Sequence, residues 1–279
     1  MINRILIPID FSESSKNQLK YGLSLGIKAQ AEIHVLHIYQ LPVVSLDAFV
    51  YVPDPENLEK IRSNFISQLF DLIKDVKFEL KTDISVAIEC QYGIPSDLIK
   101  SYAIENNCNL IVMGLQGSGY LTERILGSTT THLFRNAPVP ILGIHKSSHF
   151  VQIQNILFAY DGDLLVKKNI LEPLIDLSKI FNAKIHVLNV VEELSEFPDL
   201  AEKLFENDLS PSLPQDSVSY HIIQKNDILE GIQEYCENND IDLLTLIPKK
   251  HNILERISSE SISKQVAYHI KIPILAIHE

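Results

Sequence analysis

Three glycines with the spacing of a phosphate-binding loop are the residues of this sequence best placed to do chemistry. Gly114 and Gly117 lie three positions apart, and Gly127 follows after a longer gap with a hydroxyl residue directly behind it. Glycines let a backbone approach a ligand closely with its N–H groups available, and the start of a helix adds partial positive charge. An apolar run at 110–113 precedes the glycines, and a helical pattern at 128–135 follows them. This order of strand, glycine loop and helix start predicts a phosphate-binding site.

The glycine pattern differs from two familiar phosphate motifs. It has no Gly-Lys-Ser/Thr, as a Walker loop would, and its third glycine is too distant for the dinucleotide pattern G-x-G-x-x-G. The alternative interpretation is turn and cap chemistry, in which the glycines form a tight loop and Ser128 caps a helix. Three correctly spaced glycines favour the ligand over this alternative. Ser118, Gly119 and Thr129 are adjacent and are further candidates.

The spacing G-x2-G-x9-G-S/T, which begins at Gly114, resembles the nucleotide-binding signature of the universal stress protein family. Segments 4–12, 34–38 and 136–145 resemble the first, second and last strands of that family. The resemblance covers residues 1 to about 146 at full length, and a weaker copy covers the rest. It implies a Rossmann-like, adenine nucleotide alpha hydrolase-like fold and a bound ATP, or AMP or ADP. The residues that it implies contact the nucleotide are Pro8, Asp10, Ile38, Met113, Gly114, Gly117, Ser118, Gly127, Ser128 and Thr129.

Asp10, at the expected mouth of the sheet, has two compatible interpretations. As a ligand residue it would hydrogen-bond adenine or ribose, or help to hold a divalent cation such as Mg²⁺ beside the phosphates. As a structural residue it would be a turn or cap aspartate that follows the first strand. Ile38 would contact adenine mainly through its backbone, so its side-chain type carries little information.

No catalytic residue is predicted. His34 and His37 lie on an expected strand, where a histidine is usually packed, and no nucleophile or partner carboxylate is identifiable for them. Cys90, Cys108 and Cys236 form no C-x-x-C and no cluster with histidine, so we predict no metal site. Free thiols are typical of a reducing compartment and favour the cytoplasm.

The composition argues against two classes of partner. A formal net charge of −12 disfavours non-specific binding to nucleic acid or to anionic lipid. No apolar run reaches the roughly 18 residues of a membrane span, and the first residues lack the apolar core of a signal peptide. The acidic excess lies mostly after residue 148, so the first half would repel an anionic ligand less.

The sequence repeats itself at the scale of a domain. Segments 3–10, 31–38 and 139–145 align with 155–161, 183–190 and 272–278, and 105–113 aligns with 237–247 if two extra residues are allowed. Repeats of this length indicate a duplicated domain rather than a solenoid. We predict one domain at 1–147 and a second at 150–279, joined by a short polar segment.

The second copy departs from the pattern at the glycine loop. In the sequence alignment Pro248 stands in place of Gly114, and His251, Ser261 and Ile262 stand in place of Gly117, Gly127 and Ser128. Of the ten glycines only Gly162 and Gly231 lie in the second copy. Proline has no N–H to offer, and side chains in this loop would crowd a phosphate. We therefore predict that the second copy keeps the fold and has a degenerate nucleotide loop.

Apolar strand runs alternate with helical patterns in each copy. In the first copy strands are expected at 4–9, 33–38, 84–90, 110–113 and 139–144, with helices near 13–29, 56–75, 95–106 and from 128. This alternation predicts an α/β fold in which each copy is a doubly wound, five-stranded parallel sheet. The resemblance further implies that Val139–Ile144 and Ile272–Ile277 pair antiparallel, giving an internal pseudo-dimer, and it leaves a homodimer open.

The leading functional hypothesis is a cytoplasmic, tandem universal stress protein whose first domain binds an adenine nucleotide. The resemblance implies a role in the stress response, with conformation or partner binding biased by the ligand. An enzyme of the same fold, either a slow ATPase or an adenylyl transferase, is the first alternative, although the known loop motifs of adenylating and nucleotidyl-transfer enzymes are missing. A scaffold that binds no nucleotide is the second alternative. The sequence identifies no protein partner.

Overall fold

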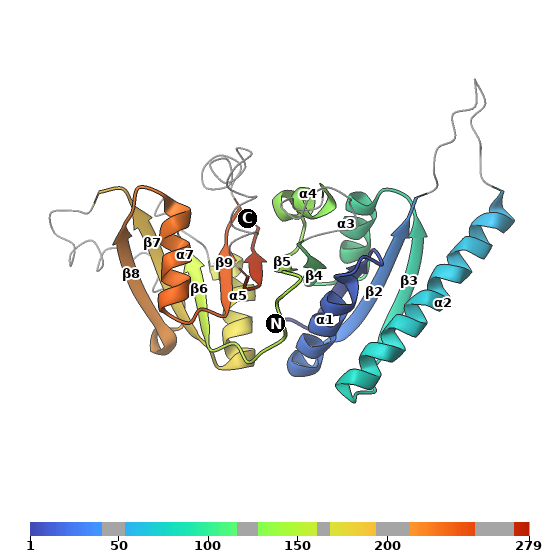
Figure 1. Cartoon of the computed structure of the whole chain (residues 1–279), viewed down its shortest axis with the longest axis horizontal. Helices are drawn as coiled ribbons and strands as arrows, with labels where there is room; N and C mark the ends of the chain where they lie inside the picture. Colours follow the sequence, from blue (N-terminus) through green and yellow to red (C-terminus); the bar gives the residue numbers. More distant parts are fainter. Residues whose placement is uncertain (41–53, 116–127, 161–167, 194–212, 249–270, 279) are drawn as a thin grey trace, which may run out of the picture.

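Strands and helices alternate along the chain, as the sequence predicts. The computed structural model describes residues 1–40, 54–115, 128–160, 168–193, 213–248 and 271–278 (Figure 1). The elements of the first half are β1 (Arg4–Ile9), α1 (Ser15–Ala29), β2 (Glu32–Tyr39), α2 (Pro55–Leu80), β3 (Val86–Tyr92), α3 (Pro95–Glu105), β4 (Leu110–Gly114), α4 (Ser128–Asn136) and β5 (Ile141–Ile144). Those of the second half are β6 (Asn155–Ala159), α5 (Lys168–Phe181), β7 (Lys184–Val191), the 3₁₀ turn η1 (Gln215–Ser217), β8 (Val218–Gln224), α7 (Ile228–Asn238), β9 (Leu243–Leu246) and β10 (Ile274–Ala276).

Local chemistry sets several element ends. The Asp54 carboxylate accepts a hydrogen bond from the Glu56 N–H and caps α2, and Asp227 does the same for α7. Helix α1 ends where Gln30 takes a left-handed conformation with φ 54°. Several predicted boundaries were wrong: α2 runs five residues beyond the expected 75 to Leu80, and α1 starts at Ser15 rather than directly behind Ser12. The strand expected at 84–90 is β3 at Val86–Tyr92, and the one expected at 139–144 begins at Ile141. The N-cap of α1 is Ser14, whose side chain makes no cap hydrogen bond.

All ten described strands form one sheet, in the order β3-β2-β1-β4-β5-β10-β9-β6-β7-β8. Neighbouring strands are parallel within each half, and only β5 and β10 are antiparallel to each other. In each half the chain first adds strands on one side of its first strand and then on the other. The strand order therefore reverses between β1 and β4, and again between β6 and β9, which is where such sheets bind ligands.

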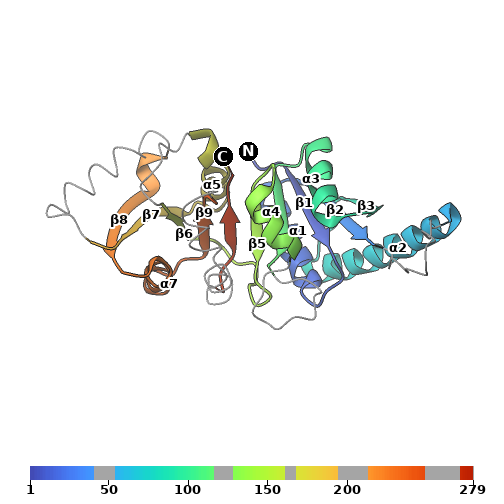
Figure 2. The ribbon, with the colours of Figure 1, turned by 90° about the horizontal axis from the view of Figure 1, so that it is seen from above.

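The two halves join through their last strands. Leu142 pairs with Leu275, and these are equivalent positions of the two copies, so a local two-fold axis passes between them. Pro140 and Pro273 directly precede the two strands, where proline removes no ladder hydrogen bond. The predicted antiparallel pairing of the last strands is confirmed, and Figure 2 shows β5 next to the second half of the molecule.

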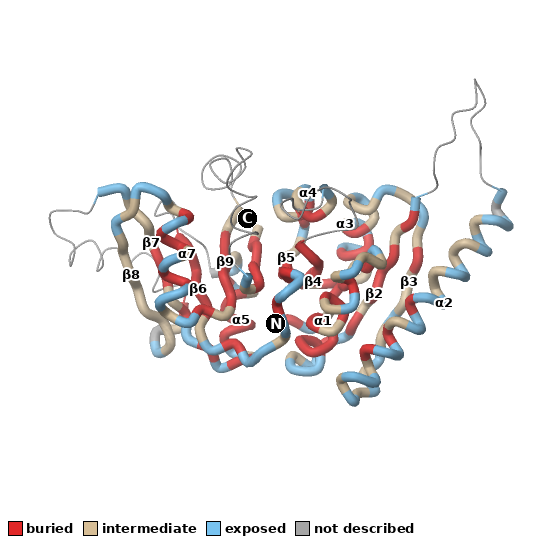
Figure 3. Tube along the Cα trace, viewed as in Figure 1, coloured by how far each residue is buried: buried red, intermediate tan, exposed pale blue. Residues whose placement is uncertain are grey.

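Helices cover both faces of the sheet and separate three buried clusters. On one face α1, α2 and α5 pack on residues of both halves, which gives the largest cluster. On the other face α3 and α4 cover the first half and α7 covers the second. The central strands are buried along almost their whole length, as expected for a parallel sheet covered on both faces (Figure 3).

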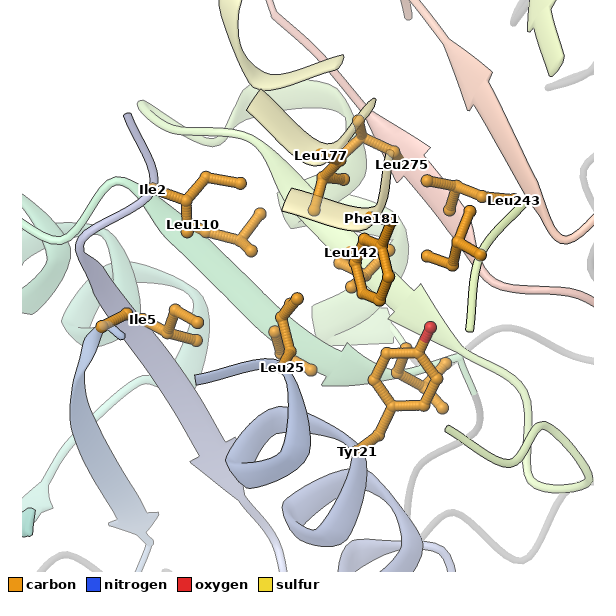
Figure 4. Packing of buried hydrophobic residues seen from close by; sticks show 14 of the residues in the cluster. Ile2, Ile5, Tyr21, Leu25, Leu110, Leu142, Leu177, Phe181, Leu243 and Leu275 are labelled. Carbon is orange, nitrogen blue, oxygen red and sulfur yellow. The ribbon is translucent and has the colours of Figure 1, made fainter. Parts of the chain in front are cut away.

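The largest cluster continues without a break across the junction of the two halves. Tyr21 and Leu25 of α1, Leu142 of β5, Phe181 of α5 and Leu275 of β10 all belong to this cluster, and Figure 4 shows their side chains gathered at the junction. The Phe150 ring lies between the aromatic rings of Tyr21 and Phe181, at centroid distances of 5.2 and 5.9 Å. The two copies thus share one hydrophobic core and are packed against each other.

The connecting segment is also held by hydrogen bonds to both halves. The Asn17 amide of α1 donates to the Ser148 carbonyl at 2.8 Å. The Ser148 hydroxyl donates to the Lys271 carbonyl, just before β10. Among the described residues, no helix has the length and apolar character that a membrane crossing requires.

Candidate functional site

The candidate site lies at the carboxyl ends of β1 and β4, where the strand order reverses. These strands are parallel neighbours, with Leu6 opposite Ile111. Asp10 follows β1 directly, and Gly114 is the last residue of β4. A crevice between the two strand ends is the position in which open α/β sheets bind nucleotides. The structure therefore brings two of the sequence-predicted residues to the same edge of the sheet.

Asp10 is exposed and is oriented by the start of α1. Its Oδ1 accepts hydrogen bonds from the Ser12 N–H at 3.0 Å and from the Ser15 hydroxyl at 2.8 Å. This is the structural role that the sequence left open for the residue. The role leaves the carboxylate at the carboxyl end of β1, so it is compatible with ligand binding.

The residue after Asp10 has an unusual backbone. Phe11 has φ 56°, a left-handed conformation that is uncommon for any residue other than glycine. Its ring packs on His37 at a centroid distance of 4.7 Å and on Phe65 of α2 at 6.0 Å. These aromatic contacts fix the turn that leads the chain from β1 past Asp10.

His37 is a packed histidine. It is buried, and its Nδ1–H donates to the Ile9 carbonyl at 2.7 Å, because a carbonyl can only accept. Burial lowers its pKa below the ordinary value, and this outweighs the opposing effects of that carbonyl and of Asp10. His34 likewise bonds the Tyr102 hydroxyl at 3.0 Å. Neither imidazole is arranged with a nucleophile among the described residues.

Gly114 is tied to the helix that follows the glycine loop. The buried Thr130 hydroxyl, in the first turn of α4, donates to the Gly114 carbonyl at 3.0 Å. Ser128 is exposed and Thr129 is half-buried in the same turn. The amino end of α4, with its partial positive charge, is thereby held beside the end of β4. Gly117, Ser118 and Gly127 lie outside the described residues.

Two residues that position the site escaped the sequence prediction. Thr130 was not chosen, although helical periodicity places it inward together with Leu133. Gln18 is buried in α1, and its amide donates to the carbonyls of Pro8 on β1 and Val112 on β4, the latter at 3.1 Å. It joins the two strands immediately below the crevice. No sequence motif marks such a glutamine.

The remaining predicted residues lie on the strands themselves. Met113 is buried in the cluster beneath α3 and α4, and Ile38 packs against the same cluster. Pro8, on β1, is partly buried. With their side chains packed in this way, Met113 and Ile38 would offer a ligand mainly their backbone groups, as the sequence predicted for Ile38.

A comparison with models of known protein families covers both halves of the chain. The model of the family described as "Universal stress protein family" matches residues 1–145 and again 152–278. The chain belongs to the universal stress protein family. Both halves are therefore universal stress protein domains, in the tandem arrangement that the repeats predicted.

Known members of the family are similar to this chain at different scales. Universal stress protein YxiE of Bacillus subtilis is 31% identical over 147 residues, which is 51% of this chain and 98% of that protein. Universal stress protein MJ0531 of Methanocaldococcus jannaschii is 26% identical over 52% of this chain and 84% of that protein. A crystal structure of a universal stress protein from Archaeoglobus fulgidus covers 100% of this chain and 97% of its own, with a TM-score of 0.72 at 20% identity. At that identity the likeness concerns the fold.

The second universal stress protein domain has different residues at the matching strand end. Strand pairing places Ile111 opposite Ile141 in the first domain and Leu244 opposite Ile274 in the second. It follows that the residue equivalent to Gly114 is Ile247.

This corrects the sequence alignment, which set Pro248 against Gly114 and allowed two extra residues. Pro248 is instead equivalent to Leu115, whose N–H donates to the Ile144 carbonyl at 3.0 Å. Proline has no N–H with which to form that bond. The alignment was wrong because the run of asparagines and aspartates before β9 aligns equally well in more than one register. Asp161, His251, Ser261 and Ile262 lie outside the described residues.

Proposed function

We propose that the first domain binds ATP, or a related adenine nucleotide such as ADP or AMP, at the crevice between β1 and β4. The observation that carries this proposal is the hydrogen bond from Thr130 to the Gly114 carbonyl. This bond holds the amino end of α4 beside the end of β4. The two elements flank a loop whose glycines have phosphate-binding spacing. Asp10 lies across the crevice, at the end of the neighbouring strand.

Each part of the site has a proposed role. The N–H groups of the glycine loop and the Ser128 hydroxyl would hold the phosphates. Asp10 would bond ribose or adenine, or would share a Mg²⁺ ion with the phosphates. The backbone groups of Met113 and Ile38 would contact the adenine base. The N–H donors and the helix end suit an anion, and they require no turnover.

We propose that the second domain is a degenerate copy and that the chain binds one nucleotide. Ile247 adds a branched side chain where the first domain has glycine, and Pro248 removes an N–H. The boundaries 1–147 and 150–279 remain our proposal for the two domains.

The proposed activity is that of a ligand-dependent switch in the stress response of the cytoplasm. A nucleotide changes conformation or partner binding only if it prefers one of two states of the protein. The nucleotide would thus act as a signal, and the protein partner is still to be identified.

Isothermal titration of the full chain with ATP, ADP and AMP, with and without Mg²⁺, tests the site. We expect a stoichiometry of one, and we expect Gly117→Val or Gly127→Val to weaken binding at least about tenfold, or about 1.4 kcal/mol. Gly162→Val places a glycine-to-valine change in the second domain, outside the segment equivalent to the glycine loop, and is the control. A stoichiometry of two would contradict the degenerate second site, and unchanged affinity in both first-domain variants would contradict the loop assignment.

A steady-state phosphate-release assay separates the switch from the enzyme. The sequence identifies no general base with an oriented partner near the loop, and hydrolysis ordinarily uses such a pair. We expect turnover well below about 1 per second, the low end of typical enzymes. Faster turnover would favour the ATPase, and an absence of any nucleotide binding would favour the scaffold.

A further inference from the structure

The nucleotide loop of the first domain is bounded on both sides by residues that pack against the second domain. On the entry side, Leu115 follows Gly114 directly and is 1% exposed. It belongs to the same buried cluster as Leu157, Leu244 and Ile274, all of which are residues of the second domain. The chain therefore enters the loop from a position fixed in the core of the other copy.

On the exit side, Phe134 of α4 packs against that same cluster as well as against the core of its own domain. A Cβ atom built on Gly143 would lie 2.4 Å from the Leu115 side chain and 2.6 Å from the Phe134 ring. Both side chains thus close over Gly143, the residue of β5 that pairs with Ile274 of β10. The absence of a side chain at Gly143 lets Leu115, which precedes the loop, and Phe134 of α4 pack together at the junction of the domains.

A hydrogen bond from the second domain also reaches the backbone of α4. The Nε2–H of His278, which follows β10, donates to the Phe134 carbonyl at 2.8 Å. The last carbonyls of a helix have no partner within the helix. In α4 the carbonyl of His132 accepts from the Asn136 amide, that of Leu133 accepts from the Ala137 N–H, and that of Phe134 accepts from His278.

The equivalent residue of the first domain has another partner among the described residues. His145 occupies the matching position after β5, and its Nδ1 lies 2.6 Å from the Ser147 hydroxyl in the connecting segment. The two histidines are therefore a matched pair in sequence position with different partners. Of these two described partners, Phe134 is the one that belongs to a helix bordering the predicted nucleotide loop.

We infer that the second domain holds the frame of the nucleotide loop of the first domain, with His278 as a positioning residue that fixes α4. The inference rests on the proposed function, because it assumes that the first domain binds a nucleotide. The second domain would support that binding without contacting the nucleotide itself. The amino end of α4 must stay beside Gly114 for Ser128 and the loop N–H groups to converge on a phosphate. The Thr130 bond secures that end, and the His278 bond secures the other.

The test uses the full chain and three variants: His278→Ala, which removes the donor; His278→Gln, which offers an amide N–H in its place; and His145→Ala, the matched control. Hydrogen exchange of peptides covering 128–136 reports directly on α4. We expect faster exchange there in His278→Ala, with exchange in α1 unchanged. We expect His278→Gln to restore most of the protection and His145→Ala to leave α4 as in the parent chain.

The affinity for ATP, measured by titration, is the second readout. Loss of one hydrogen bond with a net value of about 1 kcal/mol should weaken binding about fivefold in His278→Ala, and much less in the other two variants. Unchanged exchange in α4, or faster exchange in α4 with unchanged ATP affinity, would overturn the inference. If the parent chain itself binds no nucleotide, the proposed function fails, and exchange in α4 still decides whether His278 fixes this helix.

Discussion

The two domains are alike in their sheets and differ where the fourth strand of each one ends. His34 bonds Tyr102 in the first domain, and His186 bonds Tyr235 in the second, both at 3.0 Å. The strand order of one half repeats that of the other on the opposite side of the β5–β10 junction. Gly114, in contrast, has Ile247 as its counterpart.

Hydrogen bonds at the opposite edge of the sheet are also duplicated. The Asn109 side chain accepts from the backbone N–H groups of Asn3 and Arg4, and Asp242 accepts from those of Gln154 and Asn155. Both sets tie the loop before the fourth strand to the start of the first strand. In the described residues the sheet contacts are thus the same in both domains although the residue at the end of the fourth strand differs, so these contacts do not depend on that residue. The framework is held by buried strands and their edge contacts.

The largest expected effect tests whether the domains form one folding unit. Leu142→Asp should lower the free energy of unfolding by more than about 4 kcal/mol, because it buries a charge at the junction without a partner. Leu275→Asp should cost about as much, since the two residues face each other across the local two-fold axis. Leu142→Met, which conserves volume, should cost less than about 1.5 kcal/mol. Urea unfolding followed by circular dichroism measures these values. Two separate transitions in the parent chain would contradict the shared core.

The next prediction concerns a substitution that gives the first domain the second domain's residue at the end of the fourth strand. Gly114→Ile should weaken ATP binding at least about tenfold, or about 1.4 kcal/mol. Among the described glycines only Gly93 has a positive φ, so the backbone conformation of Gly114 does not itself require glycine. Gly114→Ala, with a smaller side chain, should have a smaller effect. An affinity equal to that of the parent chain, with native circular dichroism, would show that this strand end does not contact the ligand.

A smaller effect concerns the pH dependence of stability that His34 and His186 should cause. Burial holds the pKa of His34 and of His186 below the ordinary value of 6.5. The unfolded chain then takes up protons that the native chain does not, so stability present above about pH 6.5 is lost as the pH falls through 6.5 toward the lower native values. We expect lower urea midpoints at about pH 5.5 than at about pH 7.5. A midpoint that stays constant or rises on acidification over this range would refute the assignment.

The two histidines should contribute unequally. Near His186 the charges of His221 and Lys184 both lower the pKa further, whereas at His34 Arg4 lowers it and Glu32 opposes the lowering. His186→Gln should therefore flatten the pH dependence more than His34→Gln does. Equal flattening by the two variants would indicate that burial alone sets both pKa values.

The smallest expected effect is that of Ile247→Gly, which should not create a second nucleotide site. Ile247→Gly restores glycine in the second domain and leaves Pro248, which still lacks an N–H. Titration with ATP should still give one nucleotide per chain. A second binding event in this variant would show that Ile247 alone had closed the second site.

Much of the fold could be predicted because its signals are local. The apolar runs at 4–9, 33–38 and 110–113 became β1, β2 and β4, with ends within a residue or so of the expected ones. Burial on both faces makes such strands continuously apolar, and the glycine and proline punctuation between them is visible in a single chain. Within the glycine stretch, Gly114 and Ser128 took the predicted places at a strand end and a helix start. The other glycines of the loop remain predictions.

The sequence by itself determined the duplication, the α/β alternation and the choice of the strand ends as a candidate site. Tertiary structure alone decided that Ile247 is the counterpart of Gly114, that Gln18 and Thr130 hold the elements around the strand ends, and that His278 donates to Phe134 in the other domain. The physical reason is distance along the chain. Periodicity reports which side of a strand or helix is buried, and it carries no information on which remote residue lies opposite. That choice is made by strand register and core packing, which depend on the whole sheet.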